Sequence, residues 1–428
     1  MRSLMPDQGY LNECYHSNPN HGSSETRTVK HHRIAKRICI IRNFYFGRDP
    51  RVRKEVHALL DDGWSIDLIC QRAEGEPVTE SLNGLTVHRL PVKHLRGGKI
   101  SYLIQYSTFL LLAFIKLSSL HYKRRFDLVQ INTMPDALVF SGCLLKLFKV
   151  PLVMDMHELM PELFQSIYKV GKSHLMIRSL KWIESQSTAF SDYVITVNEQ
   201  CKKILLDRGV PKTKLCIVHN VPDDTLFTSH CNFETCDPNR RLNLFSHGCI
   251  LKRYGFETLI KAVLLLKQQN LPVHLNIAGD GEYFHVIKDL ANSLGVAESI
   301  TFFGFVPFET VKQLIEQSDI CIVCLEKDNY TDIMLPNKLF EYIAMDKPVI
   351  SSNVDTIKHY FRKGEVVFFE SGNANDLVRV IRNLSDQPEA QTRMVQKARE
   401  TYQDYVWSRE KKRYAAFLNN AINVNSLG

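Results

Sequence analysis

The stretch TDIMLPNKLFEYIAMDKPVI, residues 331–350, joins a short amphipathic helix to a buried strand. Leu339 and Ile343 fall on one helical face, and the apolar PVI that follows is typical of a strand inside a sheet. Pro336 suits the first turn of this helix, because an N–H group would have no helical partner there. The helix carries a single carboxylate, Glu341, and the pattern indicates that this residue has a specific task.

The same alternation of short strands and helices extends along the chain, and it predicts parallel sheets with crossover helices. A chain of 428 residues exceeds the size of a single core, so two domains are expected. We predict an α/β fold of two doubly wound, Rossmann-like domains that face a central cleft. Strands are expected at 38–41, 66–70, 87–90, 128–132, 152–156 and 194–197, and again at 242–246, 274–278, 300–303, 320–324, 349–351 and 366–369.

The domain boundaries follow from composition. The segment after residue 401 places Trp407, Tyr414 and Phe417 at helical spacing, which predicts a helix that crosses back to the first domain. We expect a disordered tail at 1–36, a first domain at 37–227, a polar linker at 228–241, a second domain at 242–401 and the crossing helix at 402–428.

The first helix is marked at both ends. Asp49 can cap it, Pro50 suits its first turn, and Val52 and Val56 begin its apolar face. Gly63 is expected to stop it.

Charge and cysteine usage limit the classes of partner. The net charge of +8 favours anionic partners, and without an RNA-binding or recognition-helix pattern we expect no nucleic acid. Cys321 and Cys324 are three residues apart on a strand and so lie on opposite faces, which defeats shared metal ligation. Scattered cysteines, and first 33 residues without an apolar core, predict a reducing cytoplasm.

An apolar block at 109–115 precedes the basic cluster HYKRR at 121–125. The block is shorter than the roughly 20 residues that a membrane-spanning helix requires. Two interpretations remain open: a helix that faces the core, or peripheral contact of 109–125 with an anionic membrane.

Loops of the second half carry features of a phosphate site. Gly248 ends a strand, and Lys252 and Arg253 lie in the loop before the next helix, where N–H groups and cations suit a pyrophosphate. Phe305 and Val306 follow another strand, and their backbone could contact the edge of a nucleobase.

The predicted helix within residues 331–350 contains two further candidate ligand contacts. Its start at Leu335, Pro336 and Asn337 would direct free N–H groups into the cleft, toward a second phosphate. Glu341 lies one to two turns inside, and a carboxylate accepts two hydroxyl hydrogen bonds at once, as a ribose diol requires. A salt bridge to Lys338 is the alternative role.

Several stretches taken in order carry a family resemblance. They are DPRVRKEVHALLDDGWSIDLIC, DMHELMPE and HNVPDDTLF in the first half, and HGCILKRYGFETLIKA, IAGDGE, FFGFVP and PNKLFEYIAMDKPVI in the second. From about residue 37 onward the chain resembles a family 4 glycosyltransferase of the GT-B fold.

The resemblance implies roles for particular residues. Glu341 would bind the ribose, Lys252 or Arg253 the diphosphate, and His157 would lie near the reacting sugar. The family's other glutamate, eight positions earlier, is Ile333 here, and Asp332 or Glu326 would replace it. Cys249 and Tyr254 stand where the family usually has arginine and lysine.

The resemblance also implies the reaction. A sugar would pass from a UDP- or GDP-sugar to an acceptor hydroxyl with retention, without a metal or other cofactor. Glu158 and Glu162 are acceptor-side candidates, and the acceptor would be a glycan or a lipid-linked molecule in polysaccharide or glycolipid synthesis. Two alternatives stay open: a nucleotide-sugar epimerase of the same architecture, and a catalytically degenerate scaffold in a glycan-assembly complex.

Overall fold

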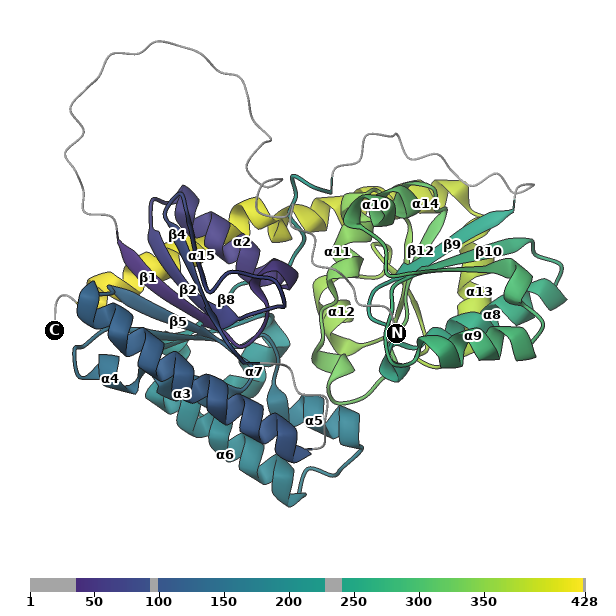
Figure 1. Cartoon of the computed structure of the whole chain (residues 1–428). Coiled ribbons are helices and arrows are strands. Elements are labelled where there is room, and N and C mark those ends of the chain that lie inside the picture. The colour runs from purple at the N-terminus through teal and green to yellow at the C-terminus, as the bar shows by residue number, and fades with distance from the viewer. Residues whose placement is uncertain (1–35, 93–98, 228–240, 426–428) are drawn as a thin grey trace, which may run out of the picture.

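The computed structural model describes residues 36–92, 99–227 and 241–425, and it contains two α/β domains side by side (Figure 1). The first domain has an eight-stranded sheet in the order β3-β4-β2-β1-β5-β6-β7-β8. The second has a six-stranded sheet in the order β11-β10-β9-β12-β13-β14. The two sheets fall within the predicted ranges 37–227 and 242–401, whereas the tail and the linker lie almost wholly outside the described residues.

The first sheet is parallel except for β3, which pairs antiparallel with β4 at one edge. Its strands are β1 (Arg37–Arg42), β2 (Ser65–Gln71), β3 (Thr79–Leu82), β4 (Leu85–Leu90), β5 (Leu128–Asn132), β6 (Leu152–Asp155), β7 (Tyr193–Thr196) and β8 (Leu215–Ile217). Its helices are α2 (Pro50–Asp61), α3 (Lys99–Lys123), α4 (Cys143–Lys146), α5 (Met160–Tyr168), α6 (Leu175–Phe190) and α7 (Glu199–Asp207), with the 3₁₀ segment η2 (Asp136–Gly142) before α4.

The second sheet is parallel throughout. Its strands are β9 (Leu242–His247), β10 (Val273–Ala278), β11 (Ile300–Gly304), β12 (Ile320–Val323), β13 (Val349–Ser352) and β14 (Val367–Phe369). Its helices are α8 (Phe256–Gln268), α9 (Phe284–Ser293), α10 (Phe308–Glu316), α11 (Asn337–Ala344), α12 (Asp355–Tyr360), α13 (Ala374–Ser385) and α14 (Pro388–Tyr402). Cys321 and Cys324 pack in separate cores on the two sides of this sheet, as predicted.

The start of α2 confirms the predicted cap. The Asp49 carboxylate accepts a hydrogen bond from the N–H of Val52 at 3.1 Å, and Pro50 occupies the first helical position. Gly63 follows the helix with a φ of 81°, a backbone conformation that glycine adopts without strain.

The last helix, α15 (Trp407–Asn425), returns to the first domain as predicted, although it begins five residues later than residue 402. It packs on α2 and β5 (Figure 1). The Tyr414 hydroxyl donates to Oε1 of Gln130 at 2.6 Å, and the ring of Phe417 meets that of Tyr193 edge-on. The preceding α14 packs instead on α11 of the second domain, so the chain crosses between domains near residue 405.

The sequence prediction underestimated the helix that contains residues 109–115. α3 has 25 residues, and its 101–123 portion is long and apolar enough to cross a membrane, judged by length and composition alone. One side of α3 nevertheless packs on the first sheet, where Phe109, Ala113 and Leu117 are fully buried. The core-facing interpretation is therefore correct for that side of the helix.

Candidate functional site

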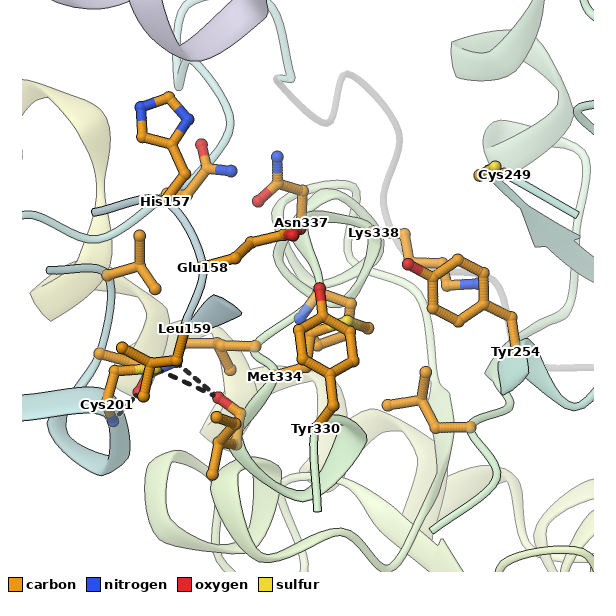
Figure 2. Close-up of a pocket in the computed structure, with 18 of the residues that line it drawn as sticks. His157, Glu158, Leu159, Cys201, Cys249, Tyr254, Tyr330, Met334, Asn337 and Lys338 are labelled. Atoms are coloured by element: carbon orange, nitrogen blue, oxygen red, sulfur yellow. Dashed lines mark hydrogen bonds between the residues drawn. The ribbon is translucent and has the colours of Figure 1, made fainter. Parts of the chain in front are cut away.

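A cavity of about 410 Å³ lies between the two domains, at the carboxyl ends of β6, β9 and β12. Ligands of doubly wound domains bind at this end of a parallel sheet. Figure 2 shows side chains from both domains around it. The first domain contributes His157, Glu158, Leu159, Val197, Asn198, Cys201 and Asn220, and the second contributes His247, Gly248, Cys249, Tyr254, Leu325, Tyr330, residues 333–338 and Glu341.

His157 follows β6 and is oriented by the last residue of that strand. Its Nε2 lies 3.0 Å from Oδ2 of Asp155 and 3.2 Å from Nδ2 of Asn132. Burial lowers the pKa of His157, helped by the charge of Arg42 and opposed by Asp155, so the ring is held neutral. Because an ionised carboxylate only accepts hydrogen bonds, Nε2 carries the proton and Nδ1 is left as an acceptor.

A buried polar network lies behind this histidine. Arg51 of α2 donates to Oδ1 of Asp155 at 2.8 Å and lies 3.0 Å from Oε1 of Glu55. Asn132 donates to both carboxylates, at 2.9 Å to Glu55 and 3.1 Å to Asp155. Gln130 also donates to Glu55, at 2.9 Å, and accepts from α15. The network therefore links the crossing helix to the cavity wall through residues that are almost completely buried.

The pKa values of the two carboxyl groups in this network are shifted in opposite directions. Burial and the neighbouring Asp155 raise the pKa of Glu55 well above its usual value. Burial opposes ionisation of Asp155 too, but Arg51 and His157 together hold its pKa far below the usual range. Arg51 thus stabilises the ionised form of Asp155, whereas burial beside Asp155 disfavours the ionised form of Glu55.

Glu55, Asp155 and His157 place their ligand atoms within 4.8 Å of one another, as a metal site would. The Arg51 guanidinium already contacts both carboxylates. A divalent cation would therefore meet a buried charge of the same sign, and these three residues do not fit a metal ion.

The first loop of the second domain brings its backbone to the cavity at Gly248, whose φ is 122°. The neighbouring turn supports it: Gly248 donates to the carbonyl of Ala278 and Ile250 to that of Asp280, both at 3.0 Å. A Cβ atom on Gly279 would lie only 1.9 Å from the Gly248 oxygen. Glycine at 279 therefore permits the contact that fixes the loop, and Asp280 is a turn residue.

The helix α11 begins at the cavity. Pro336 precedes its first residue, Asn337, and both line the cavity together with Leu335. The first N–H groups of a helix have no helical partner and carry a partial positive charge, which suits an anion. The predicted helix start and its direction toward the cleft are thus present in the structure.

Glu341 points into the gap between the domains, with its side chain only 16% exposed. Its Oε2 lies 2.8 Å from Nε2 of His247, the last residue of β9. That contact is not aligned as a hydrogen bond, and Oε2 accepts none from the residues that the structure describes. His247 is held by Tyr342, whose hydroxyl lies 2.9 Å from its Nδ1.

Two cations lie at the cavity. Lys338, in the first turn of α11, lies over the rings of Tyr254 and Phe256, and burial lowers the pKa of its ammonium to about 8. The Arg253 guanidinium lies between the rings of Tyr254 and Tyr330, both of which line the cavity. Nε of Arg253 is buried and makes no hydrogen bond to the described residues.

Glu158 of the first domain and Tyr330 of the second lie close together at the cavity (Figure 2). Burial raises the pKa of Glu158, although Tyr330 and the charge of Arg253 oppose the rise. A hydrogen bond joins the domains where Asn198 donates to the carbonyl of Ile333 at 2.8 Å.

The structure brings together only part of the predicted set. The residues that line the cavity are His157, Glu158, Gly248, Leu335, Pro336, Asn337 and Glu341. Arg253 lies directly behind two lining tyrosines. Lys252, Glu326 and Asp332 do not line the cavity, and neither do Glu162, Phe305 and Val306.

Contacts or position explain why three of these outlying residues lie away from the cavity. Glu162 turns toward Arg208, which also pairs with Glu184 at 2.7 Å. Asp332 accepts from the N–H of Asp355 at 3.1 Å, at the start of α12. Phe305 follows β11 at the edge of the sheet, two strands from β9, and is 78% exposed.

Sequence reasoning missed His247, Tyr330 and the cation role of Lys338. One signal was available for Lys338. A lysine in the first turn of a helix opposes the positive end of the helix dipole, so it indicates a nearby anion. Nothing in the local sequence marks His247 or Tyr330, because their partners lie far away in the chain.

Comparison with known proteins places this geometry in a family. A model described as "Glycosyl transferase 4-like domain" matches residues 47–221, and one described as "Glycosyl transferases group 1" matches residues 237–401. An uncharacterized glycosyltransferase of Methanocaldococcus jannaschii is 24% identical over 318 residues, which cover 70% of this chain and 76% of that protein.

Solved structures agree on the fold. Sucrose-phosphate synthase from Thermosynechococcus elongatus superposes with a TM-score of 0.73 at 18% identity, covering 91% of this chain and all of that one. Anabaena HepE in complex with UDP-glucose gives a TM-score of 0.65 at 14% identity, covering 90% of this chain and 99% of that one. The two family models span both domains, and the chain belongs to the family 4-like glycosyltransferases of the GT-B fold.

Proposed function

We propose that the protein transfers a sugar from a nucleoside diphosphate sugar to an acceptor hydroxyl, with retention of anomeric configuration. The observation that carries the proposal is the position of Glu341, an under-bonded carboxylate inside the inter-domain cavity, one turn from a helix start and two cations. A carboxylate suits the ribose diol, and the helix start and cations suit the diphosphate. HepE, solved with UDP-glucose, supports a uridine donor.

The donor's leaving group would be stabilised by the second domain. Breaking the bond between sugar and phosphate concentrates negative charge on the diphosphate and positive charge on the sugar. Lys338, Arg253 and the N–H groups at Asn337 would stabilise that negative charge, a task that a bound metal performs in other enzymes. On this account the reaction needs no metal ion.

The first domain would position the sugar and the acceptor. His157 is neutral, and its Nδ1 can accept a hydrogen bond from a sugar hydroxyl while Asp155 fixes the ring. Glu158 lines the cavity from the first domain, where it could contact the acceptor. Retention is proposed because the family resemblance implies it.

Replacing Lys338 by methionine is expected to weaken UDP binding about tenfold, or about 1.4 kcal/mol, by removing a charged contact to phosphate. Affinity for uridine, which has no phosphate, should stay unchanged. Because the ammonium pKa is about 8, wild-type affinity for UDP should fall as the pH rises past that value. Calorimetric titrations at several pH values measure both effects.

The matched control is Lys261→Met on α8, an exposed lysine paired with Glu257 at 3.5 Å, which should leave both affinities unchanged. Equal losses for UDP and uridine in the Lys338 variant would show that this lysine shapes the cavity and does not contact phosphate.

The reaction is tested by incubating the protein with UDP- and GDP-sugars, with and without candidate acceptors, and following the anomeric proton of the product by NMR. Transfer with retention supports the proposal, and inversion contradicts it. An altered nucleotide sugar formed without acceptor identifies an epimerase. A protein that binds no donor would be a scaffold.

The eight described free cysteines support a reducing compartment, so we place the reaction in the cytoplasm, where the acceptor belongs to polysaccharide or glycolipid synthesis.

A further inference from the structure

The outer side of α3 is apolar where solvent would favour charge. Residues 101–115 contain no charged side chain, so four turns of a surface helix lack one. Ile104, Leu111, Ile115 and Tyr122 recur at intervals of four or seven residues on the side opposite Phe109, and each is more than half exposed. A helix that is apolar on both sides normally has partners on both sides.

This apolar strip continues onto neighbouring elements. α3 and α6 both pack on η2, and α3 also packs on α4 (Figure 1). Leu147 and Phe148, just after α4, are exposed beside the end of α3, where the ring of Phe148 lies 5.3 Å from that of His121. On α6, Trp182 is 65% exposed at the edge of an apolar cavity of about 490 Å³ that it shares with Phe140 and Phe190.

The charged side chains within the strip's own segments are all basic, although one of them, Lys146, pairs with Asp192 at 2.6 Å. Residues 101–126, 143–150 and 172–183 contain no aspartate or glutamate. Their basic residues are Lys116, Lys123, Arg124, Arg125, Lys146, Lys149, Lys172, Arg178 and Lys181. We call these three segments the α3 face. A surface that combines exposed apolar side chains with an excess of cations complements a layer of anionic headgroups above hydrocarbon.

We propose that the α3 face docks the protein on an anionic phospholipid bilayer, with Ile104, Leu111 and Ile115 in the interface and the basic residues among the headgroups. A second copy of the chain fits this surface poorly, because two α3 faces would bring like charges together. A spanning role for α3 does not fit either, since one side of the helix is part of the first domain's core.

The position of the face relative to the cavity gives docking a consequence. The first turns of α3 adjoin the end of α5, where Tyr106 and Tyr168 interact and Ile167 is exposed. α5 begins at Met160, directly after the cavity residues 157–159. Docking would therefore hold the acceptor side of the cavity close to the bilayer, where a lipid-linked acceptor is present. This last step rests on the proposed function, whereas docking itself does not.

The test is flotation of the full chain with phosphatidylcholine vesicles that contain or lack phosphatidylglycerol. Wild type should float with the anionic vesicles only, and less at high salt. Two variants should each reduce the floated fraction at least about tenfold: Leu111→Glu with Ile115→Glu, and the reversal of Lys123, Arg124 and Arg125 to glutamate. Val286→Glu with Lys288→Glu, on exposed positions of α9, should float like wild type.

UDP binding by each variant separates the two proposals, since the α3 face contributes nothing to the donor cavity. Variants that bind UDP but no longer float support docking. The idea is overturned if wild type never floats, if both α3 variants float undiminished, or if light scattering shows a wild-type dimer that these substitutions dissociate.

Discussion

Glu341→Gln is expected to weaken UDP binding about 30-fold, or about 2 kcal/mol, because hydrogen bonds to a charged acceptor contribute about 1.5–3 kcal/mol. The substitution keeps the shape of the side chain and removes its charge and one acceptor. The partner His247 and its own support from Tyr342 remain in place. The affinity for uridine should fall by the same factor as that for UDP, because the lost contact is to ribose. The Lys338→Met variant differs, since it should lose affinity for UDP alone. Calorimetry with both ligands measures the effect.

A modified ligand serves as a control for the contact between Glu341 and the ribose diol. UDP that lacks both ribose hydroxyls should bind wild type and the Glu341 variant with similar affinity. Glu309→Gln, on the exposed surface of α10, should bind UDP as wild type does. If the variant discriminates against the dideoxy ligand as strongly as wild type does, the carboxylate at 341 does not bind the diol.

Arg51→Met is expected to lower the free energy of unfolding by about 3–5 kcal/mol, the cost of leaving a buried carboxylate without its cation. Asp155 is fully buried. Two nitrogens of the Arg51 guanidinium donate to its carboxylate oxygens, at 2.8 and 3.2 Å. Urea denaturation measures the loss. Arg393→Met removes an exposed pair with Glu389 and should cost a few tenths of a kcal/mol.

A double variant makes the test independent of general disruption. Adding Asp155→Asn to Arg51→Met removes both charges, and it should recover a large part of the lost stability. The Arg51 variant should also be most destabilised at neutral pH and less so in acid, because protonation of Asp155 then relieves the uncompensated charge. Additive losses in the double variant would contradict a charge pair and leave only packing as the explanation.

The sequence predicted those parts of the fold that local chemistry determines. The Asp49 cap and the helix that starts after Pro336 are present because one short segment contains everything they require. The strand β3 was missed, because it is a polar antiparallel edge strand without an apolar run.

Local pattern also explains which of the predicted site residues line the cavity. Gly248 and Glu341 reach the cavity because each lies close to the end of a strand or the start of a helix, which the pattern locates. Phe305 lies at an equivalent strand end but on the sheet's edge, and strand order is not encoded locally. The sequence does not show that Glu162 is paired, because its partner Arg208 lies 46 residues away in the chain.

The crossing helix has a consequence for how the chain is made. The first domain is discontinuous, because α15 supplies the Tyr414 that closes its buried network on Gln130. During synthesis on the ribosome this domain stays incomplete, with Gln130 uncovered, until the whole second domain and most of α15 have been translated. A cell that degrades incomplete chains would therefore remove truncated products before either lobe could act alone.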